Sequence, residues 1–130
     1  MKILMYSLIG LVAAIHFFFL TQQIFRWDQG RKRFDNFSDG QIVKVLASNQ
    51  GLYNGFLVAG MLWGWFSPTN STEIWTFFLS CIAIAGIYGS VTLTVGSDLP
   101  NKPYKLRLLP IIIQTIPAIV ALVLVRLLPH

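Results

Sequence analysis

Four residues with hydrogen-bonding side chains stand close together at 49–55, inside a largely apolar, uncharged run from Val45 to Phe66. These residues are Asn49, Gln50, Tyr53 and Asn54. A helix of this length crosses a bilayer at about 1.5 Å per residue, so the cluster lies at membrane depth if the run spans one. Polar groups at that depth face other helices or a watery cavity, where they bind a ligand or join helices.

The three other apolar runs of the chain each contain polar residues as well. His16 and Gln23 lie in the first, Tyr88 in the third and Gln114 in the fourth. Counted from the ends expected to face the cytoplasm, His16, Asn54, Tyr88 and Gln114 lie at depths of about 9 to 14 Å. We therefore expect the polar side chains of all four helices to meet in one layer. The predicted ligand-binding residues are Gln23, Asn49, Gln50, Tyr53, Asn54, Tyr88 and Gln114.

His16 is the candidate catalytic residue, because it alone in this layer has a reference pKa near neutrality and can act as an acid or a base. No Asp or Glu lies within the apolar runs, so a paired-carboxylate mechanism and a carboxylate-supported triad both lack a member. One imidazole with amide oxygens makes a weak metal site, and Cys81 is the only cysteine. We expect no metal and no other cofactor.

The composition indicates which elements position these residues. Of the 130 residues, 55% are hydrophobic and only 12% are charged, which is too apolar for an ordinary soluble domain. We predict an all-α polytopic membrane protein, a bundle of four transmembrane helices in one domain over residues 1–130. The predicted spans cover about 3–25, 45–66, 74–95 and 108–126, with a basic loop at 26–44.

The distribution of Lys and Arg predicts the orientation. The connections 26–44 and 96–107 hold five and three of the ten basic residues, and the termini and the 67–73 turn hold the other two. By the positive-inside rule the two basic connections face the cytoplasm and both termini lie outside, as expected in a bacterial inner (plasma) membrane. Basic loops of this kind contact anionic lipid, and no basic domain remains to bind nucleic acid.

Glycine and proline positions predict where the helices pack closely and where one bends. The pattern Gly51-x-x-x-Gly55 allows close approach of a second helix, as does Ala85-x-x-x-Gly89 with Gly86 alongside. Pro117 should kink the fourth helix and free the carbonyl near Ile113.

The run Asn-Gln-Gly-Leu-Tyr-Asn-Gly-Phe-Leu-Val-Ala-Gly-Met-Leu-Trp-Gly at 49–64 resembles a small bacterial and fungal membrane family called DUF1304. The resemblance extends over nearly the whole chain. Its other landmarks are His16 with Phe25 and Trp27, Cys81-x-x-x-Ala85-Gly86-x-Tyr88-Gly89-x-x-Thr92, and Gln114-x-x-Pro117-Ala118. It implies four helices and a shared polar motif in a family of unknown function.

This chain departs from that family pattern beside the histidine. A glutamate commonly precedes the first-span histidine in the family, and another follows it by seven residues. Here those positions are Ile15 and Gln23. A mechanism that needs carboxylates beside His16 therefore does not carry over to this chain.

Three functions remain in competition. The leading hypothesis is a membrane module that binds or carries a small, partly apolar molecule in the polar layer. The second is an intramembrane enzyme in which His16 acts as acid or base and Gln50, Asn54 or Tyr88 orient the substrate. The third is a structural membrane subunit. The expected partners are the lipid bilayer and a small lipophilic ligand, and a homo-oligomer stays open.

Overall fold

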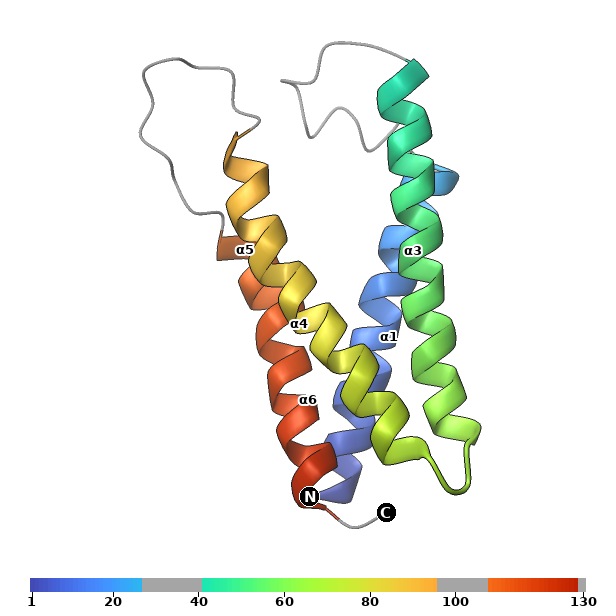
Figure 1. The fold of residues 1–130 in the computed structure, drawn as a ribbon, viewed down its shortest axis with the longest axis vertical. Helices are drawn as coiled ribbons and strands as arrows, with labels where there is room; N and C mark the ends of the chain where they lie inside the picture. The colour runs from blue at the N-terminus through green and yellow to red at the C-terminus, as the bar shows by residue number, and fades with distance from the viewer. Residues whose placement is uncertain (27–40, 96–107, 129–130) are drawn as a thin grey trace.

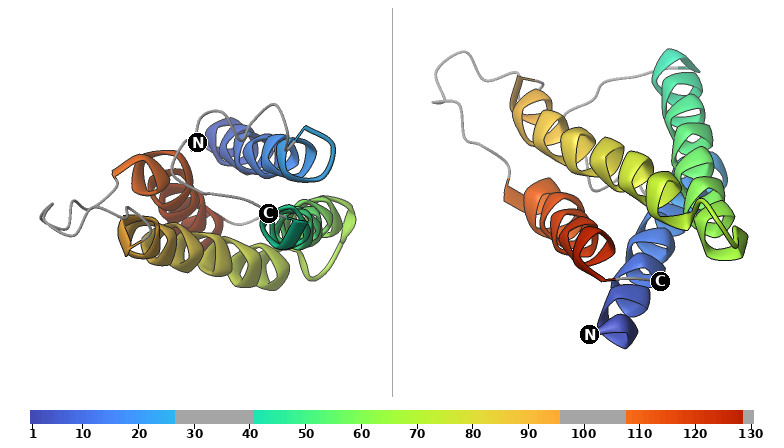
Figure 2. Two further views of the ribbon diagram at one scale, coloured as in Figure 1. Left: turned by 90° about the horizontal axis from the view of Figure 1, so that it is seen from above. Right: turned by 60° about the horizontal axis from the view of Figure 1, so that its bottom comes forward.

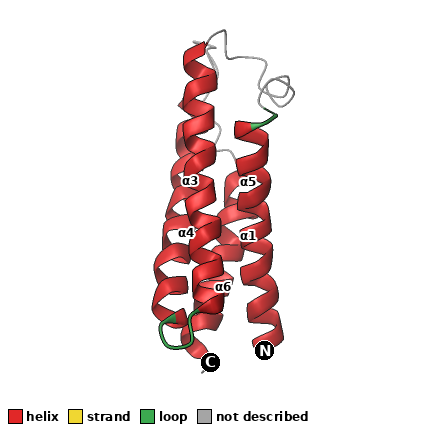
Figure 3. Cartoon of the chain, turned by 90° about the vertical axis from the view of Figure 1, so that its right-hand side faces the viewer, coloured by secondary structure: helices red, strands yellow, loops and turns green. Residues whose placement is uncertain are grey.

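The computed structural model describes residues 1–26, 41–95 and 108–128, and every regular element in this part of the chain is helical (Figure 3). The helices are α1 (Lys2–Ile24), α3 (Gln41–Phe66), α4 (Ser71–Val95), and a last stretch formed by α5 (Leu108–Pro110), η2 (Ile111–Thr115) and α6 (Ile116–Leu127). The prediction of an all-α fold with four long helices is confirmed. The segments 27–40 and 96–107, which hold most of the predicted basic loops, lie outside the described residues.

Three of the four helices are long and apolar enough to cross a membrane: α1, α4 over Ser71–Thr92, and the last stretch over Leu108–Leu127. α3 has 26 residues but falls short in hydropathy, because it carries the polar cluster of Asn49, Gln50 and Asn54. α3 also begins at Gln41, four residues before the predicted boundary, so the residues just before Val45 are helical and do not belong to the loop.

The helices form two neighbouring pairs. α1 packs along α3, and α4 packs along η2 and α6. The start of α1, the end of α6 and the short connection from α3 to α4 lie at one end of the molecule (Figure 1). From that connection α3 and α4 diverge toward the other end of the molecule, as the tilted view also shows (Figure 2).

The apolar core occupies the half of the molecule near the termini. Its buried side chains come from all four long helices: Met5, Ile9 and Val12 of α1, Met61 of α3, Trp75, Leu79, Ile82 and Ala83 of α4, and Ala118, Ala121 and Val125 of α6. Many large apolar side chains, in contrast, point outward from every helix. The core is therefore narrow, and most of the apolar surface is left for contact with the surroundings.

The connection between α3 and α4 is fixed by local hydrogen bonds. The backbone N–H of Asn70 donates to Ser67 Oγ at 3.3 Å, and the N–H of Ile74 donates to the carbonyl of Asn70 at 3.0 Å. Glu73 lies in the first turn of α4, where a negative charge is favourable beside the helix dipole. Buried Trp75 then donates its indole N–H to the carbonyl of Met61 at 3.0 Å, which joins α4 to α3.

The last helix contains a π-helical turn, Ile111–Thr115, just before Pro117. Proline has no N–H for the carbonyl four residues earlier, and a wider turn is one way for a helix to absorb that defect. The bend predicted near Ile113 thus takes the form of this turn. Thr115 Oγ1 donates to the carbonyl of Ala83 at 3.1 Å and lies against Gly86 of α4.

Glycines mark the closest helix contacts, as predicted for Gly51 and Gly55. A Cβ at Gly51 would lie 2.7 Å from Ile24 Cγ1, and one at Gly55 would lie 3.1 Å from Leu20 Cδ1. In α4 the close contact is made by buried Gly86, whereas Ala85 is exposed and Gly89 has room for a side chain. The expected Ala85-x-x-x-Gly89 contact is therefore displaced to Gly86.

Candidate functional site

His16 occupies the buried face of α1. Met5, Ile9, Val12 and His16 follow one another at intervals of four, three and four residues, which places them in one stripe along the helix. The first three belong to the apolar core, and His16 continues the stripe beyond it with 2% of its surface exposed. The imidazole is thus held in the interior by the same periodicity that builds the core.

Asn54 of α3 meets this histidine across the α1–α3 contact. Its Oδ1 lies 2.7 Å from His16 Nδ1, and its Nδ2 donates to Gln23 Oε1 at 2.8 Å and to the backbone carbonyl of Gln50 at 3.1 Å. Asn54 is itself buried, with 6% exposure. One amide therefore links two side chains of α1 and the backbone of α3.

The carbonyl of Gln50 determines the direction of every bond in this network. A backbone carbonyl can only accept, so the atom of Asn54 that faces it is the amide nitrogen. The oxygen of Asn54 then faces His16, and His16 Nδ1 must carry the proton that it donates. By the same reasoning Gln23 accepts through Oε1 and keeps its NH₂ group as a donor.

His16 Nε2 is left as a buried acceptor. In the neutral tautomer that donates from Nδ1, the other ring nitrogen carries a lone pair and no hydrogen. Among the described residues, Nε2 has no hydrogen-bond partner. The ring of Phe19, one turn further along α1, stands edge-on to the imidazole with the ring centroids 5.8 Å apart. The site therefore combines a fixed polar ring with an aromatic neighbour.

The network joins two helices and not the four that we expected from the depth of the polar residues. The side chains of Asn49 and Gln50 are exposed, as are Tyr53 (53%) and Tyr88 (70%). Gln50 contributes only its backbone carbonyl.

Helix rotation explains the absence of Tyr88 from the network. The depth of a residue gives its height along a helix but not the direction of its side chain. Tyr88 is two residues from buried Gly86 and two from buried Ser90, and this spacing turns it to the opposite face of α4. Gln114 lies half-buried in the π-helical turn, with its Cβ against Gly86.

The site offers hydrogen bonding and one titratable ring. No group of three or more His, Cys, Asp or Glu side chains that could hold a metal ion occurs within the described ranges. Gln23, which stands where the family resemblance led us to expect a glutamate, acts here through its oxygen, and a carboxylate could accept the same hydrogen bond.

A family model described as a protein of unknown function, DUF1304, matches residues 10–126. The chain belongs to the DUF1304 family. The matched region includes His16, Gln23 and Asn54, so the whole network lies within the part shared with the DUF1304 model. The chain is also similar to an uncharacterized protein, YpaA, of Lactococcus lactis subsp. lactis (strain IL1403), with 27% identity over 97 residues that cover 65% of this chain and 76% of the relative. No solved structure shows a significant match.

Proposed function

We propose that this DUF1304 member is an integral membrane protein of four spans that binds or carries a small, partly apolar molecule at His16. Three of its helices are apolar enough to cross a membrane, and large apolar side chains are exposed on all of them. Soluble monomers rarely expose apolar surface on this scale. α3 completes the bundle as the fourth span, because Asn54, which contributes to its lower hydropathy, is paired with α1.

The observation that carries the binding proposal is the buried, unpartnered Nε2 of His16. Leaving a buried acceptor unsatisfied costs about 1 to 3 kcal/mol, and in a bilayer core no bulk water is at hand to satisfy it. Asn54 holds the ring so that this lone pair has a fixed direction. A ligand with one O–H or N–H donor and an otherwise apolar structure matches such a site. The donor can bond to Nε2, and the apolar part of the ligand can take the place of lipid chains.

One observation also favours the enzyme hypothesis. A base held in position by a third group is the arrangement found at activated nucleophiles, and Asn54 holds His16 in that way. His16 Nε2 would then take the proton of the bound donor instead of merely accepting a hydrogen bond. Both hypotheses require a molecule bound at His16. Retention of a ligand therefore tests the site in either case, and turnover of that ligand tests the enzyme hypothesis.

The test is to extract the purified protein and compare what it retains by mass spectrometry. His16→Asn is the informative variant, since an amide N–H near the position of Nδ1 can still donate to Asn54, while the acceptor at Nε2 is lost. Asn49→Leu is the matched control, because Asn49 is exposed on α3 and makes none of the described hydrogen bonds of the network.

We expect wild type and Asn49→Leu to retain the same small molecule and His16→Asn to lose at least about 90% of it. The loss of a single hydrogen bond of about 1.4 kcal/mol weakens binding about tenfold. Equal retention by folded His16→Asn would refute binding at Nε2. If His16→Asn fails to fold while Asn49→Leu folds, the histidine is structural and the protein is better described as a structural membrane subunit.

A further inference from the structure

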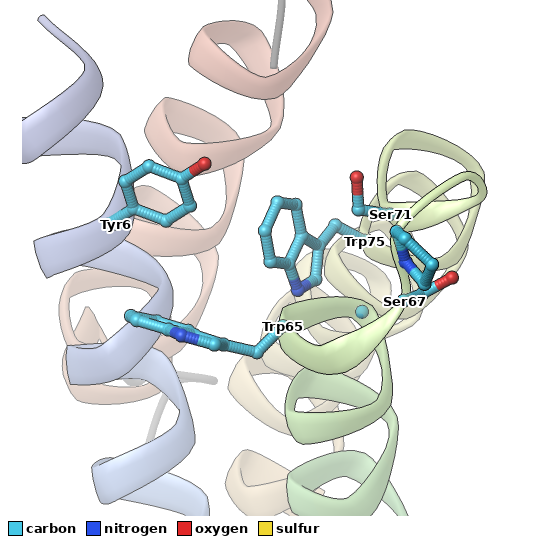
Figure 4. A pocket seen from close by; sticks show the side chains of 7 residues that line it. Tyr6, Trp65, Ser67, Ser71 and Trp75 are labelled. Atoms are coloured by element: carbon cyan, nitrogen blue, oxygen red, sulfur yellow. The ribbon is translucent and has the colours of Figure 1, made fainter.

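The connection between α3 and α4, at the other end of the molecule, lies beside a cavity. Seven residues line this cavity of about 370 Å³: Tyr6, Gly64, Trp65, Ser67, Pro68, Ser71 and Trp75. They come from the start of α1, the end of α3, the connection and the start of α4 (Figure 4). The volume falls within the range of about 300 to 1,000 Å³ found for small-ligand sites.

Three aromatic rings form the wall of this cavity. The centroid of Tyr6 lies 5.4 Å from that of Trp65 and 5.9 Å from that of Trp75, and the two tryptophans are 6.4 Å apart. The angles between the ring planes are 53°, 76° and 80°, so the rings stand as steeply inclined walls instead of a parallel stack. The position of these rings is fixed by Trp75, which is buried and donates its indole N–H to the carbonyl of Met61.

The chemistry of the lining selects the charge of the occupant. None of the seven lining residues is acidic or basic, and its polar groups are the hydroxyls of Tyr6, Ser67 and Ser71 together with the indoles. An anion would find no positive side chain in this wall, and Glu73 in the first turn of α4 already offsets the positive end of that helix beside Ser71. A cation, however, is attracted by the negative faces of aromatic rings, tryptophan most strongly, and needs no carboxylate.

The position of the cavity along the bundle indicates the source of the cation. α3 ends at Phe66 and α4 begins at Ser71, so the cavity lies where these helices, as membrane spans, would leave the hydrocarbon for the headgroups. Lys2 precedes Tyr6 by four residues and stands one turn nearer the end of α1 on the same face. A zwitterionic headgroup fits this arrangement, with its ammonium group in the aromatic cavity and its phosphate nearer Lys2 at the start of α1.

An ordinary aromatic belt would not produce this arrangement. Belt residues point individually toward the lipid, as Trp63 does with 62% exposure. Tyr6, Trp65 and Trp75 come instead from three different helices and contact one another, with Trp75, only 2% exposed, as the buried support and Tyr6 and Trp65 as the rings that can face an occupant. We propose that this cavity binds the quaternary or primary ammonium of a phospholipid headgroup by cation–π interaction. The proposal shares only the membrane setting with the site at His16.

Saturation-transfer NMR on the wild-type protein in dodecyl maltoside tests the requirement for charge. The probes are choline and 3,3-dimethyl-1-butanol, which has the same shape but a carbon in place of the charged nitrogen. We expect transfer to the methyl groups of choline to exceed transfer to those of the neutral alcohol by about two- to fivefold. Equal transfer to both probes would overturn the proposal and leave a merely apolar pocket.

Two tryptophans of α3 provide a matched pair of variants. Trp65 lines the cavity and Trp63 does not, although both lie near the end of α3 and are exposed. Trp65→Leu should lose the choline signal and Trp63→Leu should keep it, with both variants checked for helicity by circular dichroism. Equal signals from the two folded variants would contradict the proposal. If Trp65→Leu does not fold, the comparison of choline with the alcohol decides alone.

Native mass spectrometry identifies the source of the ammonium group. The protein is titrated with dioleoyl phosphatidylcholine and dioleoyl phosphatidylglycerol in the same detergent. A preference for phosphatidylcholine that Trp65→Leu abolishes assigns the site to a lipid headgroup. Choline binding without any lipid preference supports a free amine as the occupant, and a preference for phosphatidylglycerol would refute an ammonium site.

Discussion

Asn54 is the residue on which the polar site depends, because its single amide satisfies groups on both α1 and α3. It accepts from His16 and donates to Gln23 and to the carbonyl of Gln50. A substitution that removes this amide leaves several partners without their bonds at once. The stability of the bundle and the geometry of the proposed ligand site are thus coupled at one position.

We predict that Asn54→Leu lowers the free energy of unfolding in detergent by about 1 to 3 kcal/mol, because it leaves the His16 N–H unpaired in a buried position. Asn49→Leu should change it by less than about 0.5 kcal/mol, as expected for an exposed residue without network contacts. Thermal unfolding followed by circular dichroism measures both. Equal effects of the two substitutions would show that the network contributes nothing to the fold.

Sequence alone selected His16, Gln23 and Asn54, which the structure joins in one hydrogen-bond network, since polar residues in apolar runs are few and their depths can be counted. It did not show which of them meet. Gln50 was expected to contribute its side chain but contributes its carbonyl, and Tyr88 was expected inside but is exposed. Both outcomes depend on the rotation of each helix about its axis, which depth does not determine.

The polar bonds between α1 and α3 require the close contact of these two helices at Gly51. A Cβ added at Gly51 would lie 2.7 Å from Ile24 Cγ1 and 3.1 Å from Gln23 Cβ, so only a glycine fits there without displacing atoms of α1. Gln23 is also a member of the polar network, so a side chain at 51 presses on the site itself. The sequence pattern of small residues predicted this contact correctly.

We predict that Gly51→Ala destabilises the protein by about 1 to 3 kcal/mol, as overpacking in a tight contact does. Gly10→Ala is the matched control, because nothing lies within 4 Å of a Cβ at Gly10 and alanine is the better helix former. Gly10→Ala should therefore leave stability unchanged or raise it by up to about 1 kcal/mol. The opposite order of the two variants in thermal unfolding would contradict the α1–α3 contact.

The aromatic cavity was not predicted from the sequence. Trp65 lies near the end of α3, where aromatic residues of membrane spans are enriched beside the headgroups. The contributions of Tyr6 and Trp75 were not predicted, because they depend on the start of α1 and the start of α4 lying beside that end. A signal was present, since both residues lie close to predicted helix ends, where aromatic residues are enriched in membrane proteins.

In the whole molecule the start of α1, the end of α6 and the α3–α4 connection lie at the same end of the helix bundle (Figure 1). This arrangement is compatible with an even number of membrane crossings. The eight basic residues of 26–44 and 96–107 then predict that this end faces outward. The count of basic residues thus predicts the orientation of the protein in the membrane, which the helices alone do not show. Most of those basic residues lie outside the described part of the chain.

We predict that, in a Cys81→Ser background, a cysteine at Asn70 reacts with a membrane-impermeant maleimide added to intact cells. Asn70 is exposed in the α3–α4 connection. A cysteine at Lys32, outside the described residues, should react only after the membrane is permeabilised. The reverse pattern would invert the orientation and place the His16 site in the outer half of the bilayer.

The central claim is that a small molecule other than bulk lipid occupies the site at His16, and photocrosslinking in the membrane tests it most directly. Benzoylphenylalanine is placed at Phe19, whose ring lies 5.8 Å from that of His16, and as a control at Phe77, which is 63% exposed on α4. After irradiation the adducts are identified by mass spectrometry. We predict a distinct adduct of one small molecule at position 19, which His16→Asn abolishes, and only bulk phospholipid at position 77. The same phospholipid adducts at both positions would contradict the claim.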